Sequence, residues 1–121
     1  MKTKLTKQFK FEAAHSLPNH DGKCKNLHGH SYILEVTVSG EKHISGPKEG
    51  MIIDFSDLSK IVEENIINKW DHQFLNEILP FTTTAENLAE ECFKILKHNN
   101  LQVEKIKLWE TSKSFVEVSK N

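Results

Sequence analysis

The sequence predicts an α+β fold in which a four-stranded antiparallel sheet carries two helices on one face. Three observations predict it. Apolar and polar residues alternate over two segments near the N-terminus and two shorter segments near the C-terminus, as they do in strands. Two segments between them repeat apolar residues at helical spacing. The length of 121 residues suits one compact domain, residues 1–121.

The composition is that of an ordinary globular protein, with 27% charged and 37% hydrophobic residues. The formal net charge of -1 gives no indication of a nucleic-acid partner, and no apolar run is long enough to span a membrane. The N-terminus lacks the apolar core of a signal peptide, so we expect a cytoplasmic protein. Two cysteines, Cys24 and Cys92, are too few for a disulfide framework, and we expect both to be reduced thiols.

The first predicted strand covers residues 5 to 15. Its apolar face ends at His15, and Lys7 is the exception on that face. Residues 17 to 27, "LPNHDGKCKNL", are rich in turn formers and predict a loop that contains Cys24.

The second strand starts at His28 and continues to residue 38. Successive side chains of a strand point to opposite faces, so His28, His30 and Tyr32 share the apolar face of this strand. Imidazole is an unusual side chain there. Residues 40 to 50 hold three glycines and a proline and predict a surface connection.

Two helices follow. Asp54 or Ser56 is the predicted cap of the first helix, whose apolar stripe extends to Trp70 before "DHQFLNEILPF" interrupts it. The second helix begins near "TTTAENL", where Thr83 and Glu86 have the spacing of a capping box, and ends at "HNN".

Residues 103 to 110 and 114 to 118 predict a final hairpin. The resulting sheet has two open edges, which soluble proteins cover, charge or pair with another subunit. We therefore expect a homo-oligomer.

Three histidines are the strongest candidates for chemistry. His15 ends one strand, and His28 and His30 begin the next, so antiparallel pairing brings all three to one end of one face. Zinc binds imidazole readily, and three protein ligands with a free fourth position are typical of catalytic zinc. The alternative is that each histidine is separately hydrogen-bonded.

Cys24 leaves two further alternatives. As a fourth zinc ligand it would close a structural site, whereas as a free thiol beside the metal it could act as a base or nucleophile. An inert loop cysteine is also compatible with the pattern. Cys92 lies on an apolar helical stripe and is expected in the core.

Two carboxylates complete the candidate set. Asp71 precedes His72 in a non-periodic stretch, where a carboxylate can fix the tautomer of a histidine that moves protons. Glu110 lies on the inward face of a predicted strand, so it should meet a cation or a ligand with several N–H donors, unless its side chain escapes to water at the strand end.

Six motifs together resemble one known family. "FEAAHSLP", "CKNLHGH", "MIIDFSDL", "WDHQFLN", "TAENLA" and "LWET" occur in the order and approximate spacing of the 6-pyruvoyltetrahydropterin synthase / 6-carboxytetrahydropterin synthase family. The resemblance covers residues 9 to about 118. It implies a tunnelling fold, in which subunits join their sheets into a barrel and assemble as hexamers, dimers of trimers, with active sites at subunit interfaces.

The resemblance also implies roles for the candidate residues. It makes Cys24 the catalytic thiol and not a ligand, with Asp71 and His72 as the accompanying proton relay. It makes Glu110 the anchor of the pterin ring and Thr84 a weaker candidate for pterin contact. The zinc ligands that it implies are His15, His28 and His30.

Three residues between Cys24 and "HGH" resemble the bacterial 6-carboxytetrahydropterin synthases of queuosine biosynthesis. The implied substrate is 7,8-dihydroneopterin triphosphate, and the implied products are 6-carboxy-5,6,7,8-tetrahydropterin, acetaldehyde and triphosphate. The alternatives are the 6-pyruvoyl synthase reaction, which eliminates triphosphate and keeps the side chain, and a non-catalytic module that binds zinc and pterin.

Overall fold

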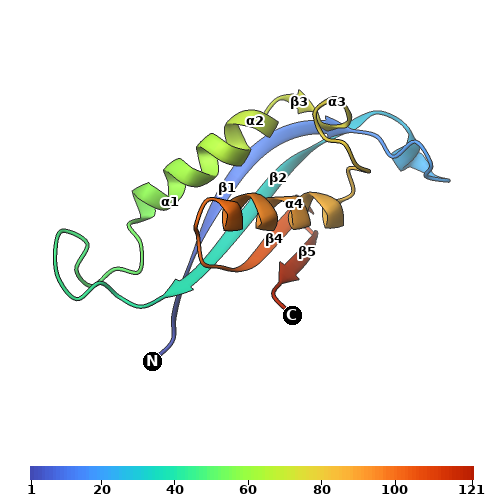
Figure 1. Cartoon of the computed structure of the whole chain (residues 1–121). Coiled ribbons are helices and arrows are strands. Elements are labelled where there is room, and N and C mark those ends of the chain that lie inside the picture. The colour runs from blue at the N-terminus through green and yellow to red at the C-terminus, as the bar shows by residue number, and fades with distance from the viewer.

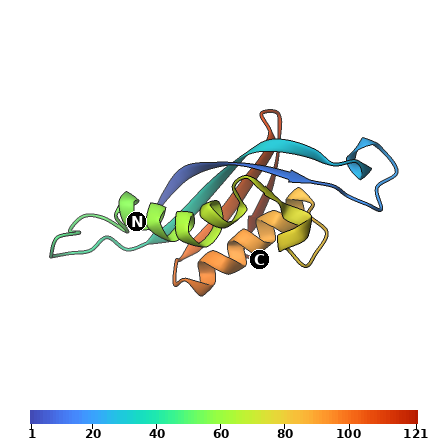
Figure 2. The same cartoon turned by 90° about the horizontal axis from the view of Figure 1, so that it is seen from above.

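A computed structural model describes residues 1–121. A five-stranded sheet in the order β3-β1-β2-β4-β5 carries the helices on one face (Figures 1 and 2). The strands are β1 (Thr3–His15), β2 (His28–Gly40), β3 (Gln73–Phe74), β4 (Val103–Thr111) and β5 (Ser114–Ser119). The helical elements are η1 (Lys23–Lys25), α1 (Phe55–Val62), η2 (Glu63–Ile67), α2 (Asn68–Trp70), α3 (Leu75–Ile78) and α4 (Ala85–His98).

The long β1–β2 ribbon positions the candidate metal ligands. The two strands pair antiparallel without a bulge, from Thr3 opposite Gly40 to His15 opposite His28. This register places Phe11 opposite Tyr32, and both side chains are buried under the helices. Because one face is buried, a slip of one residue would turn every apolar side chain to the wrong side.

The core lies between the inner face of the sheet and the helices. It contains 20 buried apolar residues, which come from β1, β2, β4, the long helical run, α3, α4 and the connection between α4 and β4. The faces predicted from alternation are confirmed at its centre, where Tyr32, Leu34 and Val36 of β2 have no exposed surface. The inner face therefore changes from aliphatic to histidine at one end of the ribbon.

The first predicted helix is a continuous run of α1, η2 and α2, with one π-helical turn at Glu63–Ile67. Asp54 caps its start, because its carboxylate accepts a hydrogen bond from the backbone N–H of Ser56 at 2.8 Å. None of the helices combines the length and the apolar character that a membrane span requires.

The predicted cap of the last helix was wrong by one residue. Thr84, not Thr83, is the N-cap of α4, and its hydroxyl accepts from the backbone N–H of Asn87 at 3.2 Å. Thr83 is instead fully buried, and its role belongs to the histidine site.

The predicted count of four strands was also too low by one. The two residues of β3 pair parallel to Ala13 and Ala14 on the outer edge of β1. A strand of two residues is too short for an alternating pattern to reveal it. The rest of the predicted sheet, with its C-terminal hairpin, is confirmed.

Candidate metal centre and active site

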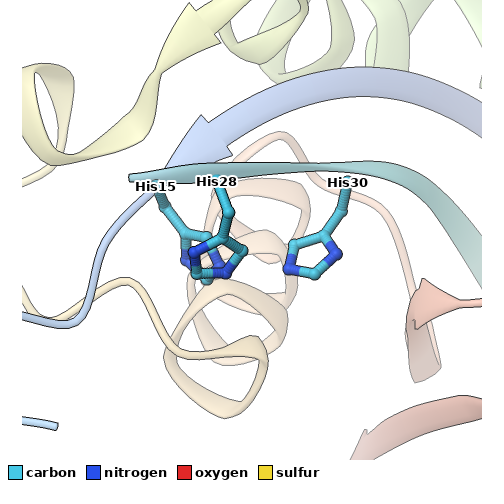
Figure 3. Close-up of side chains that lie close together, drawn as sticks. All are labelled: His15, His28 and His30. Atoms are coloured by element: carbon cyan, nitrogen blue, oxygen red, sulfur yellow. The ribbon is translucent and has the colours of Figure 1, made fainter. Parts of the chain in front are cut away.

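The end of the β1–β2 ribbon holds a cluster of three imidazoles. Each of His15, His28 and His30 offers one ring nitrogen, and these atoms lie within 4.8 Å of one another. The rings converge on the helix side of the sheet (Figure 3). Their centroids are 4.5 Å apart for His15 and His28 and 4.9 Å apart for His28 and His30. The structure thus brings together the three histidines that the strand pattern placed on one face.

Backbone carbonyls fix the tautomers of two of these rings. The Nδ1–H of His15 donates to the carbonyl oxygen of Thr83 at 2.7 Å, and the Nδ1–H of His28 donates to that of Asn26 at 2.7 Å. A carbonyl oxygen only accepts, so the proton of each neutral ring sits on Nδ1. Nε2 is then left with a free lone pair, which is the state a metal ligand needs.

Two nitrogens of the cluster are buried without any partner. They are the Nε2 atoms of His15 and His30. Burial lowers the pKa of His15 and of His30, the nearby Glu110 only partly opposes this, and both rings are therefore held neutral. Buried polar atoms normally have a partner, so a small cation among these rings would satisfy an otherwise costly arrangement. The donor set fits zinc, with three imidazoles and no fourth protein ligand in the group.

Cys24 lies apart from this cluster. It is the middle residue of η1 in the loop between β1 and β2, and its side chain is half-buried. The loop closes through a hydrogen bond from the N–H of Leu17 to the Cys24 carbonyl at 2.8 Å. The thiol is not among the ligand atoms that lie within 4.8 Å of one another. This geometry favours a free thiol over a fourth ligand.

Asp71 and His72 form a hydrogen-bonded pair at the edge of β1. The Nδ1–H of His72 donates to Asp71 at 2.8 Å, and the other Asp71 oxygen accepts from the backbone N–H of Glu12 at 2.8 Å. These bonds, that of the Glu12 N–H first, lower the pKa of Asp71. His72 holds a positive φ of 60° and also donates its backbone N–H to the Glu12 carbonyl, so Glu12 fixes the pair from both sides.

No hydrogen bond or ion pair joins the Asp71–His72 pair to the three histidines of its own chain. The His72 side chain is largely exposed, at 78%, and borders a cavity of about 490 Å³. The walls of that cavity also include Glu12, Ala14 and Ser31, which lie on the outer face of the sheet, and His30 of the imidazole cluster.

Glu110 lies beside the imidazoles. Its carboxylate oxygens are 3.7 Å from Nε2 of His30 and 3.9 Å from Nε2 of His15, and the side chain is 31% exposed. Glu110 and Thr84 also border one cavity of about 350 Å³, together with Leu17 and Phe115. An open cavity with a carboxylate at one wall and imidazoles nearby can take a polar heterocycle.

Sequence reasoning missed the residues that hold His15 in place. The side-chain amide of Asn76, in α3, bonds both the N–H and the carbonyl of Ser16, at 3.0 and 2.8 Å. It also accepts from the Thr83 hydroxyl at 3.4 Å, and Thr83 carries the carbonyl that orients His15. Carbonyl partners leave no mark in a sequence. The polar Asn76 after a buried leucine was a signal available in "QFLNEIL".

Comparison with known proteins shows the family of the chain. The family model described as 6-pyruvoyl tetrahydropterin synthase matches residues 4–121. The chain is 44% identical to 6-carboxy-5,6,7,8-tetrahydropterin synthase of Haemophilus influenzae, over 94% of this chain and 96% of that protein. It is 32% identical to the dihydroneopterin monophosphate aldolase of Pyrococcus furiosus, over 98% of each chain.

A solved structure agrees as well. The 6-pyruvoyl tetrahydropterin synthase of Caenorhabditis elegans superimposes with a TM-score of 0.85 at 27% identity, covering 100% of this chain and 97% of that one. The fold is thus the tunnelling fold that the motifs implied. The family match spans the strands that carry the imidazole cluster and the segments that carry Asp71, His72 and Glu110. The chain belongs to the 6-pyruvoyl tetrahydropterin synthase family of pterin lyases.

Proposed function

We propose that the protein is a zinc-dependent 6-carboxy-5,6,7,8-tetrahydropterin synthase of the cytoplasm that serves queuosine biosynthesis. It would convert 7,8-dihydroneopterin triphosphate and water to 6-carboxytetrahydropterin, acetaldehyde and triphosphate. The observation that carries the proposal is the three-histidine cluster with two buried, unpartnered nitrogens. The choice of reaction is supported by the 44% identical relative of that name, which this chain matches over nearly its full length.

In this proposal His15, His28 and His30 hold the zinc ion through Nε2. When bound, the ion supplies Lewis-acid polarisation of the oxygen atoms on the substrate side chain. The Nδ1 hydrogen bonds from His15 and His28 to backbone carbonyls keep those two rings pointed at the metal position while substrate enters and product leaves.

Proton transfer is assigned to Cys24 and His72. The Nδ1–H of His72 is engaged by Asp71, so the ring can accept and release a proton at Nε2. Because no hydrogen bond or ion pair joins the pair to the imidazole cluster of its own chain, it would serve the active site of a neighbouring subunit. This fits the hexamer that we propose, in which each site combines Cys24 of one chain with the relay of another.

Recognition of the pterin is assigned to Glu110 and Thr84. An ionised carboxylate accepts two parallel N–H donors well, and the 2-amino group and ring N–H of a pterin offer such a pair. The two residues border the same cavity, which Phe115 also lines. Holding that edge of the ring fixes the reacting side chain relative to the metal.

The identity of the reaction products tests the proposal. Zinc-loaded protein is incubated with 7,8-dihydroneopterin triphosphate, and the pterin and any aldehyde are identified by mass spectrometry. We expect 6-carboxytetrahydropterin together with acetaldehyde. A 6-pyruvoyl product would move the protein to the triphosphate-eliminating reaction. Unchanged substrate in the presence of stoichiometric zinc would leave a non-catalytic pterin-binding module.

A further inference from the structure

Tyr32 carries the one unpartnered polar atom of this region that a metal does not explain. Its side chain has no exposed surface, and its hydroxyl has no hydrogen-bond partner. The other buried side-chain atoms without a partner are Nε2 of His15 and Nε2 of His30, which are metal ligands in the proposed function. A buried donor without an acceptor destabilises a folded chain, so the hydroxyl needs a partner that arrives later.

The Tyr32 ring is fixed at the border between the core and the site. It stacks on Phe11 with centroids 4.8 Å apart and planes at 10°. Its edge meets the ring of His30 at 5.5 Å and the ring of His15 at 6.3 Å. A ring packed on both sides cannot turn its hydroxyl toward water, so the partner must come to it.

Glu110 is the candidate acceptor. Ile33 pairs with Trp109, so one step further along both strands the same register puts Tyr32 and Glu110 at neighbouring positions on the inner face of the sheet. A phenol hydroxyl donates a hydrogen bond to an ionised carboxylate, which can only accept.

In this structure the Glu110 carboxylate faces two imidazoles and makes no hydrogen bond with the Tyr32 hydroxyl. Its two oxygens face Nε2 of His30 and Nε2 of His15 at 3.7 and 3.9 Å. Those two nitrogens would be occupied when a metal is bound. The partly exposed carboxylate is then free to turn, and it has lone pairs for two N–H donors of a pterin and for one further donor.

We propose that the Tyr32 hydroxyl donates a hydrogen bond to the Glu110 carboxylate when Glu110 takes the pterin edge, which makes Tyr32 a positioning residue for substrate recognition. The inference rests on the proposed function, in which Glu110 is the pterin anchor. A carboxylate held by a fixed donor presents its remaining lone pairs in one orientation, and less conformational freedom is lost when the pterin binds.

The test uses Tyr32→Phe, which removes the hydroxyl and keeps the ring. The probe is neopterin, a fluorescent pterin without phosphates, titrated into zinc-loaded protein in the wild-type and Glu110→Gln backgrounds. We expect Tyr32→Phe to weaken neopterin binding about tenfold in the wild-type background, the size of one hydrogen bond to a charged group. In the Glu110→Gln background, where the acceptor is neutral, we expect a loss of about threefold or less.

Zinc content and the midpoint of urea unfolding distinguish a positioning role of Tyr32 from a structural one. Because the hydroxyl has no partner before ligand binds, Tyr32→Phe should keep its zinc content and unfold in urea at the same midpoint as the wild type or a higher one. Phe11→Leu is the packing control: it should lower the midpoint and change neopterin affinity less than Tyr32→Phe does.

The outcomes are distinct. An unchanged affinity in Tyr32→Phe, an equal loss in both backgrounds, or a lowered urea midpoint would each overturn the role of Tyr32, the last because the hydroxyl would then have a partner in the free protein. If Glu110→Gln itself leaves neopterin affinity unchanged, the anchor role in the proposed function fails, and the inference fails with it. If Glu110→Gln weakens binding and Tyr32→Phe does not, only the inference fails.

Discussion

At the scale of single residues, the two cysteines of the chain occupy opposite environments. Cys24 lies half-buried in the loop beside the ligand strands, whereas Cys92 is fully buried in α4. Burial raises the pKa of the Cys92 thiol far above its ordinary value, so that thiol is inert. Only Cys24 is accessible to a substrate.

Replacement of Cys24 by alanine should therefore abolish turnover and leave the fold intact. We expect kcat to fall at least about a hundredfold, the usual size of a lost acid–base group, with zinc content and unfolding midpoint unchanged. Steady-state kinetics and metal analysis of the purified variant measure both. Cys92→Ala is the matched control and should lower stability while keeping kcat. Loss of zinc from the Cys24 variant would instead identify a closed structural site.

The candidate histidines were predictable because a strand period of two is strict. Once His15, His28 and His30 share a face and two strands pair at their ends, the convergence follows from the backbone. The partners of these rings were not predictable. The carbonyls of Thr83 and Asn26 bond them, and every residue has a carbonyl, so only the folded chain reveals which ones serve.

At the scale of elements, α3 is a short helix whose main task is to hold the end of β1. Its Asn76 side chain bonds the backbone of Ser16 through both amide atoms, directly after the ligand His15. The same amide accepts from Thr83. The Asn76 side chain thus connects α3 with the end of β1 and with Thr83, which orients the candidate ligand His15.

Asn76→Ala should weaken the metal centre without touching a ligand. We expect zinc affinity to drop about tenfold, as for other residues that orient a metal ligand, and the unfolding free energy to fall by about 1–2 kcal/mol. Competition with a chromogenic chelator measures the affinity. Asn99→Ala, which loses a comparable bond to the Ile95 carbonyl at the far end of α4, is the control and should keep zinc affinity. Equal affinities in both variants would show that α3 does not orient His15.

The cap of α1 makes an acid-sensitive contribution to stability. Hydrogen bonds from Ser56, with a smaller effect of Lys48, hold the pKa of Asp54 at about 2, below its ordinary value of 3.8. A carboxyl whose pKa is lowered by folding stabilises the fold at pH values above its pKa in the unfolded chain. This contribution is lost as pH falls toward about 2, the pKa in the folded chain.

Asp54→Asn should therefore be less stable than the wild type at pH 7. The difference should shrink as pH falls from about 4 toward about 2, because the carboxyl of the unfolded wild type protonates first and that of the folded protein follows. Urea unfolding followed by circular dichroism at several pH values measures this. Asp57→Asn also loses a contact with Lys48 but not the cap, so its effect at pH 7 should be smaller. A pH-independent difference for Asp54→Asn would assign the effect to packing and not to charge.

The elements that the sequence did not reveal are short or displaced by one position. Long alternation predicted β1, β2 and the terminal hairpin, and helical periodicity predicted the two main helices. β3 has two residues and no period to detect. Thr83 and Thr84 are chemically equivalent as caps. Thr83 instead bonds His15 in the protein interior, which leaves Thr84 as the N-cap of α4.

At the scale of the whole molecule, two features of the single chain point to assembly with further copies. The sheet ends in open edges at β5 and along the first part of β1, beyond the short β3. The Asp71–His72 pair makes no hydrogen bond or ion pair with the imidazole cluster of its own chain. An assembly that joins sheet edges and brings the relay of one chain to the metal of another would resolve both.

Mixed assemblies test this directly. Cys24→Ala and His72→Ala should each be inactive alone, and co-expression of the two variants should restore a measurable part of the wild-type activity. Restoration arises because some sites then receive an intact thiol from one chain and an intact relay from its neighbour. Separately purified variants that are mixed without subunit exchange are the control. Complete inactivity of the co-expressed variants would place thiol and relay in one chain.

The β1–β2 loop, residues 16–27, begins and ends next to the candidate metal ligands His15 and His28, which pair with each other in the sheet. We expect mutations in the middle of the loop to preserve the ligand geometry as long as they spare Ser16 and Asn26, whose backbones bond Asn76 and His28. Evolution can exchange the reactive side chain presented from this loop while it inherits the metal centre intact. Such a division between a constant centre and a variable loop allows one ancestral scaffold to diversify among reactions, and the relatives of this chain carry names for more than one.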